Sequence, residues 1–153
     1  MVVGARSELN LGWLRAQSND FDSAVNEWQR AIDDGIASGS PDGYLIAAQA
    51  GFNLGLLYSR DGNATDAFAA WTLAAKNARR VDSDLAHEVC AHIALNLGAL
   101  YAQTGRLSDA MSAWQMAISE GHIGASKPAR DAAVKASFNL GLLEVDQLAR
   151  SAA

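Results

Sequence analysis

The residues whose types could perform chemistry lie in one short stretch, His87-Glu88-Val89-Cys90-Ala91-His92. Histidine, cysteine and glutamate are zinc ligands, and His-Glu-x-x-His on a helix is typical of zinc hydrolases. Here the two histidines are five residues apart, so they stand about 140° apart around a helix instead of sharing a face. His87 and Cys90 could share a face, but only His122 remains as a further histidine ligand. We therefore expect no metal site.

The sequence also lacks the common catalytic patterns. It contains no glycine-rich P-loop, no nucleophile elbow and no carboxylate pair associated with a histidine. We therefore expect a non-enzymatic protein without a cofactor.

An asparagine side chain recurs every 43 residues inside one short phrase. The four copies are Leu9-Asn10-Leu11-Gly12, Phe52-Asn53-Leu54-Gly55, Leu95-Asn96-Leu97-Gly98 and Phe138-Asn139-Leu140-Gly141. A repeat period of roughly 20–50 residues marks a solenoid, in which each unit buries its apolar face against a neighbour. The asparagines are thus expected at equivalent positions of successive structural units.

Further residue types recur in phase with this phrase and predict pairs of antiparallel helices. A turn residue (Asn19, Gly62 or Gly105) follows seven positions after the glycine, and Ala, Trp and Ala then occur at fixed offsets. The aligned tryptophans are Trp28, Trp71 and Trp114. Small residues let two helices approach closely, and one large ring fills the wedge between them. The helices are expected at residues 3–18, 20–34, 42–60, 63–79, 83–103, 106–120 and 128–150.

Local signals predict where the second helix of each pair begins and ends. Asp20 and Asn63 are expected to be N-caps. Gly35 and Gly121 are expected to stop this helix in two copies. The middle copy lacks that glycine and is expected to continue through Ala78-Arg79-Arg80.

These anchors resemble the tetratricopeptide repeat family over nearly the whole chain. The resemblance rests on the Leu-Gly pair, the tyrosine three positions later, the turn glycine, and the alanines and tryptophan at their offsets. The period of 43 exceeds the family's usual ~34, and Glu120-Gly121-His122 is similar to Sel1-like repeats. The resemblance implies an all-α, right-handed solenoid of antiparallel helix pairs. One domain over residues 1–153 would contain repeats at about 1–40, 41–81 and 82–126, then a C-terminal helix at 127–150.

The same resemblance implies that the first helix of each pair lines a concave groove for a peptide. Helix geometry then selects the positions that share a face with the repeated asparagine. The peptide-binding residues expected on this basis are Asn10, Asn53, Asn96, Asn139, Trp13, Phe52, Leu56, Arg6, Gln49, His92, Lys135 and Arg60.

The asparagine column is the main functional prediction. An amide offers both a donor and an acceptor, so a ladder of amides can bind the main chain of an extended peptide. The alternative is that each asparagine caps or bridges helices within the solenoid. Trp13 occupies a groove position that holds Leu or Ala in the other copies. It is either an aromatic anchor for the ligand or a cap on the first repeat.

Charge narrows the class of partner. The net charge of −5 argues against a nucleic acid, because phosphate binding needs a clustered basic surface. The expected groove nevertheless holds Arg6, Arg60, His92 and Lys135 against one acid, Asp146. This balance favours a partner with carboxylates beside apolar side chains. The alternative is that long cationic side chains cover apolar surface at the rim.

The C-terminal helix carries apolar residues on more than one face, which predicts self-association. The residues expected to form this interface, in a homodimer, are Leu142, Leu143, Val145 and Leu148.

The sequence as a whole predicts a peptide-binding adaptor. The alternative is a self-assembling structural scaffold, a homo-oligomer in which the groove or the C-terminal helix binds another copy of the chain. No apolar run approaches the ~18 residues of a membrane span, and the single cysteine suits a reducing compartment. We therefore expect a cytoplasmic protein, and the preference for Ala, Arg and Gly over Lys suggests a bacterial source.

Overall fold

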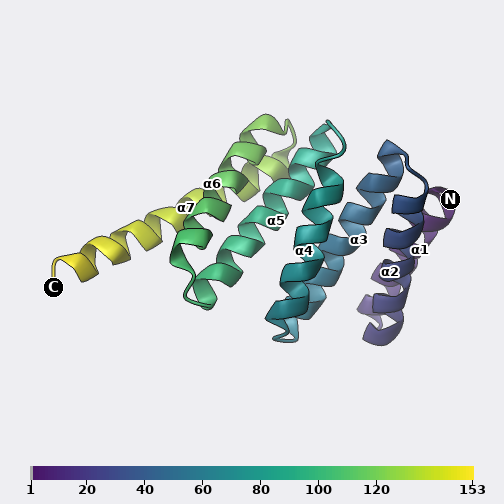
Figure 1. Ribbon diagram of the computed structural model, residues 1–153, viewed down its shortest axis with the longest axis horizontal. Helices are drawn as coiled ribbons and strands as arrows, with labels where there is room; N and C mark the ends of the chain where they lie inside the picture. Colours follow the sequence, from purple (N-terminus) through teal and green to yellow (C-terminus); the bar gives the residue numbers. More distant parts are fainter. Residues whose placement is uncertain (1) are drawn as a thin grey trace. The chain divides into compact units, whose positions relative to one another are not determined.

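The computed structural model describes residues 2–153, which form an all-α protein (Figure 1). Seven helices and no strand occur in this part of the chain. The helices are α1 (Val2–Gln17), α2 (Phe21–Ala37), α3 (Pro41–Arg60), α4 (Ala64–Ala78), α5 (Asp84–Gln103), α6 (Leu107–Ile123) and α7 (Lys127–Ser151). The all-α repeat fold predicted from the sequence is therefore confirmed.

The chain divides into two compact units, Met1–Asp82 and Ser83–Ala153, and each is described by itself. In unit 1, α1 packs against α2, α2 against α3 and α3 against α4, while α1 also contacts α3. In unit 2, α5 packs against α6, α6 against α7, and α5 also contacts α7. The boundary falls where the second repeat was expected to end. The single domain over residues 1–153 remains a prediction.

Each tryptophan of the repeat is buried between the two helices of its pair, as expected. The indole Nε1 of Trp28, Trp71 and Trp114 donates to a carbonyl oxygen of the preceding helix, over 3.2 Å in every case. The acceptors belong to Leu9, Phe52 and Leu95. The ring therefore supplies both a large apolar contact and a satisfied polar group.

The glycine of the repeated phrase makes room for this ring. A Cβ atom added at Gly55 would lie 2.1 Å from Trp71 Nε1, and one at Gly98 would lie 2.3 Å from Trp114 Nε1. A Cβ atom added at Gly12 would lie 2.4 Å from Trp28 Nε1. No real Cβ atom tolerates such distances, so the Leu-Gly phrase and the tryptophan form one packing motif.

Two expected helix ends are wrong. Gly35 and Gly121 lie inside α2 and α6, which continue to Ala37 and Ile123. A Cβ atom at Gly35 would lie 2.5 Å from the Gly43 carbonyl oxygen of α3. One at Gly121 would meet α7 at 2.4 Å. Both glycines therefore serve close helix packing and not helix termination.

The middle copy also differs from expectation, because α4 ends at Ala78 and does not continue through Arg80. Asp20 and Asn63 are N-caps as predicted, and their side chains accept from the Ser23 and Asp66 backbone N–H groups.

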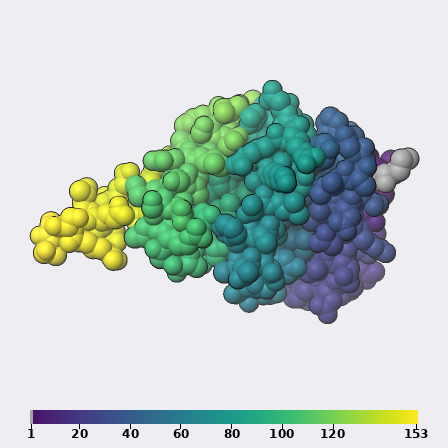
Figure 2. Space-filling model, in the orientation of Figure 1, coloured from purple at the N-terminus to yellow at the C-terminus, as the bar shows by residue number. Residues whose placement is uncertain are grey.

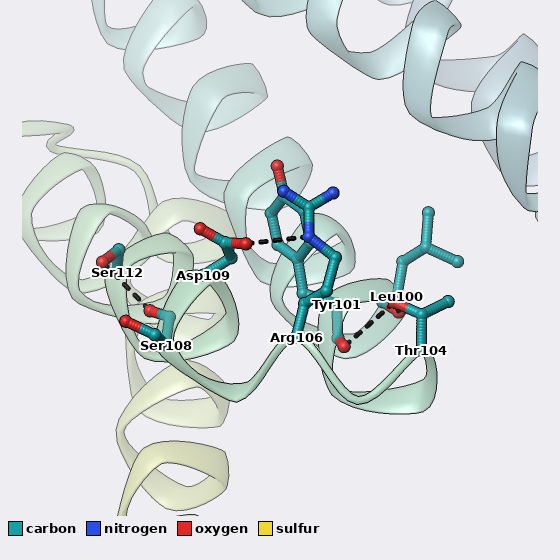
Figure 3. Close-up of polar contacts among 7 residues, drawn as sticks. All are labelled: Leu100, Tyr101, Thr104, Arg106, Ser108, Asp109 and Ser112. Carbon is teal, nitrogen blue, oxygen red and sulfur yellow. Dashed lines mark hydrogen bonds and ion pairs between the residues drawn. The ribbon is translucent and has the colours of Figure 1, made fainter.

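The turns inside the helix pairs follow the predicted residues. Gly62 and Gly105 have positive φ, as does Asn19, which also favours the left-handed region. Figure 3 shows the turn between α5 and α6, where Arg106 occupies the N-cap position without a side-chain cap. Its guanidinium instead lies over the Tyr101 ring and pairs with Asp109 through Nε at 2.8 Å.

Candidate functional site

The stretch that resembles a zinc motif joins helices in unit 2. His87 Nδ1 lies 2.7 Å from Glu120 Oε2, which links α5 to α6. The Ser126 hydroxyl donates to Glu88 Oε2 over 2.7 Å, which links α5 to the start of α7. Cys90 is buried. In the described part of the chain, no three histidine, cysteine or acidic side chains could together hold a metal ion.

Unit 2 contains an open depression of about 400 Å³ between α5 and α7. It is lined by Ala99, Ala102, Trp114, Asn139, Leu142 and Leu143. The small side chains of Ala99 and Ala102 leave the space, and the lining is otherwise apolar apart from Asn139. The structure thus places one residue of the predicted asparagine column beside an apolar surface. Such an arrangement can accept an apolar side chain and pair with a neighbouring peptide group.

The neighbouring asparagine of unit 2, Asn96, is partly committed to its own helix. Its Nδ2 donates to the His92 carbonyl oxygen over 2.8 Å, and His92 Nδ1 lies 2.8 Å from the Glu88 carbonyl oxygen. Both side chains are half-buried. The side chains of Asn96 and His92 therefore already form hydrogen bonds within α5 and would keep or exchange them on binding a ligand.

In unit 1, the predicted residues of α1 are exposed and those of α3 are more enclosed. Arg6, Asn10 and Trp13 are all exposed on α1. On α3, Gln49, Phe52 and Asn53 are half-buried, while Leu56 is exposed. The half-buried Phe52 also supplies the carbonyl that accepts from Trp71, so it belongs in part to the core packing. Unlike Asn96, the side-chain amides of Asn10, Asn53 and Asn139 form no hydrogen bond within residues 2–153.

The cations of the predicted groove differ in their surroundings. The Arg60 guanidinium lies 4.7 Å from the centre of the Phe21 ring, so this charged group stacks on an aromatic side chain of α2. Lys135 is exposed on α7. The one predicted acid, Asp146, pairs with Arg150 at 2.9 Å. The charge of Asp146 is therefore partly balanced within α7 itself.

Of the four residues expected to self-associate, three are exposed and one is not. Leu142, Val145 and Leu148 are exposed on α7, whereas Leu143 is half-buried against the core of unit 2.

Glu8 is a polar residue that the sequence did not single out. It lies on α1, and its Oε2 atom is buried without a hydrogen-bond partner within the described residues. Burial raises the pKa of this carboxyl group, and the nearby Asp34 raises it further, while Arg30 opposes the change. The repeat could have identified Glu8 as unusual, because the equivalent positions of the other copies hold residues that are not ionisable: Gly51, Ala94 and Ser137.

No family model matches the chain, and no curated protein is significantly similar to it. None of the helices described has the length and apolar character needed to cross a bilayer.

Proposed function

We propose that this protein is a non-catalytic, tetratricopeptide-like adaptor that captures an extended peptide segment of a partner protein. The face formed by the first helix of each pair would bind the peptide. In unit 1 this face belongs to α1 and α3, and in unit 2 to α5 and α7. We place this activity in the cytoplasm.

The observation that carries the proposal is the position of Asn139 beside the apolar depression of unit 2. The depression of about 400 Å³ falls within the ~300–1,000 Å³ of small-ligand pockets. It is therefore large enough for an apolar side chain of a peptide. The amide can meanwhile pair with the peptide main chain, each hydrogen bond contributing roughly 0.5–1.5 kcal/mol net.

The chemistry of the face favours a peptide that carries both apolar and acidic residues. Trp13 and Leu56 are exposed apolar side chains in unit 1, and Arg6 and Lys135 are exposed cations. An exposed cation steers an acidic ligand and contributes modestly to affinity. Apolar burial would supply most of the binding energy, at roughly 25 cal/mol per Å².

Peptide display against the full chain tests this proposal. We expect selection of peptides with apolar and acidic residues, and a loss of binding of at least tenfold in Asn53→Ala/Asn139→Ala. Gln29→Ala/Gln115→Ala is the control, because it also removes one side-chain amide from each unit, on α2 and α6 instead of the proposed face. Equal binding by both double variants, or no selected peptide, would contradict the proposal.

The second candidate function is a self-assembling scaffold. The exposed apolar side chains of α7 favour it.

A further inference from the structure

The C-terminal helix keeps half of a packing motif that is complete elsewhere. In α1, α3 and α5, the glycine of the repeated phrase lies directly under a tryptophan ring from the next helix. In α7 the equivalent glycine is Gly141, and a Cβ atom added there would meet no atom within 4 Å. The face of α7 that corresponds to the covered face of the other three helices is therefore open.

The side chains around Gly141 on this face are large, apolar and exposed. The exposed fraction is 69% for Val134, 66% for Phe138, 65% for Val145 and 70% for Leu148. With Gly141 they follow one another at intervals of four, three, four and three residues, which is the spacing of a helix-pairing seam. We call these five residues the α7 seam. The C-terminal end of α7, drawn in yellow, projects beyond α6 (Figures 1 and 2).

The α7 seam differs from its counterparts in a way that favours another long helix. Val134 stands where α5 has the smaller Ala91, and Val145 stands where α5 has Ala102. Leu148 stands at the position of the turn residue, and α7 continues past it to Ser151. The seam is therefore bulkier and longer than the faces that α2, α4 and α6 cover.

The seam is also nearly symmetric about Gly141. Val134 and Leu148 lie seven residues on either side, and Phe138 and Val145 lie three and four residues away. In an antiparallel pair of identical helices, Val134 of one helix would therefore face Leu148 of the other. Phe138 would face Val145 in the same way. The two glycines would meet at the crossing point and let the helices approach closely. A two-fold interface requires this self-complementarity.

Charge favours the same orientation. Lys127 pairs with Asp131 in the first half of α7, and Asp146 pairs with Arg150 in the second half. This leaves Arg130 and Lys135 as the other charges of the first half and Glu144 as that of the second half. An antiparallel pair places the cationic first half of one α7 beside the acidic second half of the other. A parallel pair would place the two cationic halves side by side.

We propose that a second copy of this chain packs its α7 antiparallel against the α7 seam, with the two helices crossing at Gly141. This inference does not depend on the proposed peptide binding.

Light scattering after size exclusion tests whether the pair forms. We expect twice the 16.1 kDa of one chain for the wild type. Val145→Glu/Leu148→Glu should halve the mass with its helix content unchanged, because both side chains are exposed. Val3→Glu/Leu14→Glu is the control, since it charges two exposed apolar residues of α1 and should leave the mass doubled. A monomeric wild type, or an unchanged mass in the α7 variant, would overturn the proposal.

Disulfide trapping tests the orientation in a Cys90→Ala background, where the equivalent positions hold Ala47 and Ala133. We expect Gly141→Cys to cross-link to itself. Val134→Cys should do so only when mixed with Leu148→Cys, because the first position faces the second. Cross-linking of Val134→Cys alone would show parallel helices and overturn the proposal. A monomer that binds a peptide of the α4 sequence through this face would overturn it also, since the occupant would then be a tryptophan-bearing helix.

Discussion

The tryptophan and glycine of each complete repeat depend on one another. Trp71 is buried, and its ring occupies the space above Gly55 that a Cβ atom would need. Because the ring also donates to the Phe52 carbonyl, it cannot move away without losing a hydrogen bond. This residue-scale contact fixes the distance between α3 and α4, and therefore which face of α3 stays uncovered by α4.

Gly55→Ala should consequently destabilise unit 1. Alanine favours helix over glycine by about 0.5–1 kcal/mol, but overpacking against Trp71 costs about 1–3 kcal/mol. We expect a net loss in the free energy of unfolding, measured by urea denaturation. Gly4→Ala is the matched control in the same unit, because its Cβ would lie 3.7 Å from Asp34 Oδ2, an ordinary contact. Gly55→Ala as stable as Gly4→Ala would contradict this account of the packing.

Glu8 should make the stability of unit 1 depend on pH. Burial and Asp34 raise the folded-state pKa of Glu8 above its value in the unfolded chain. A carboxyl group with a raised pKa contributes stability that is fully present below the unfolded pKa and lost as pH rises through the folded pKa. We therefore expect Glu8→Gln to gain stability relative to wild type between about pH 4 and pH 7.

The measurement is thermal unfolding of wild type and Glu8→Gln at both pH values. Glu144→Gln, on the exposed side of α7, is the control and should show no such gain. An equal difference between Glu8→Gln and wild type at the two pH values would contradict the prediction.

Residue types alone predicted some of these contacts and missed others. The tryptophans were predicted to be buried because they recur with small residues at helical spacing. Gly35 was misinterpreted because a glycine near a helix end suits both a helix stop and a close helix crossing. Only the position of Gly43 on the facing helix distinguishes the two.

At the scale of the element, helix starts depend on side-chain caps. The Asn63 side chain accepts from the Asp66 backbone N–H over 3.2 Å at the start of α4. We expect Asn63→Ala to cost about 0.5–2 kcal/mol in chemical denaturation. Thr65→Ala, an exposed change in the same turn, should stay within about 0.5 kcal/mol of wild type. Equal effects of both changes would show that the cap contributes nothing.

The helices themselves were largely predictable, because the repeat supplied several anchors for each one. The α7 seam was predicted only in part. Val145 and Leu148 were expected to self-associate, but Val134 was missed and Leu143 turned out to be half-buried in unit 2. The spacing of exposed residues about Gly141 becomes visible only when the covered faces of α1, α3 and α5 are known.

At the scale of the whole molecule, the segment between the two units should be the first to be cut by a protease. Arg79 and Arg80 are exposed and follow the end of α4. Protease sites outside helices are cleaved first, since cleavage requires an extended backbone. We expect trypsin to cut after one of these arginines first, as seen by mass spectrometry of early fragments. A first cut after Arg106, in the α5–α6 turn, would contradict this expectation.

The candidate site was predictable as a set of positions but not as a shape. The repeat identified Asn139 and Leu142 as members of one face. It did not show the depression, which exists because Ala99 and Ala102 are small and Trp114 lies beside them. Nor did it show that Asn96 bonds within its own helix.

The proposed function requires that the asparagine-bearing face captures a peptide. Nitrogen-resolved NMR of the side-chain amides, recorded as a selected peptide is added, tests it most directly. We predict that the amide signals of Asn53 and Asn139 shift with peptide concentration, while those of Gln29 and Gln115 stay in place. Shifts confined to the two glutamines, or no shift at either asparagine, would contradict peptide capture by this face.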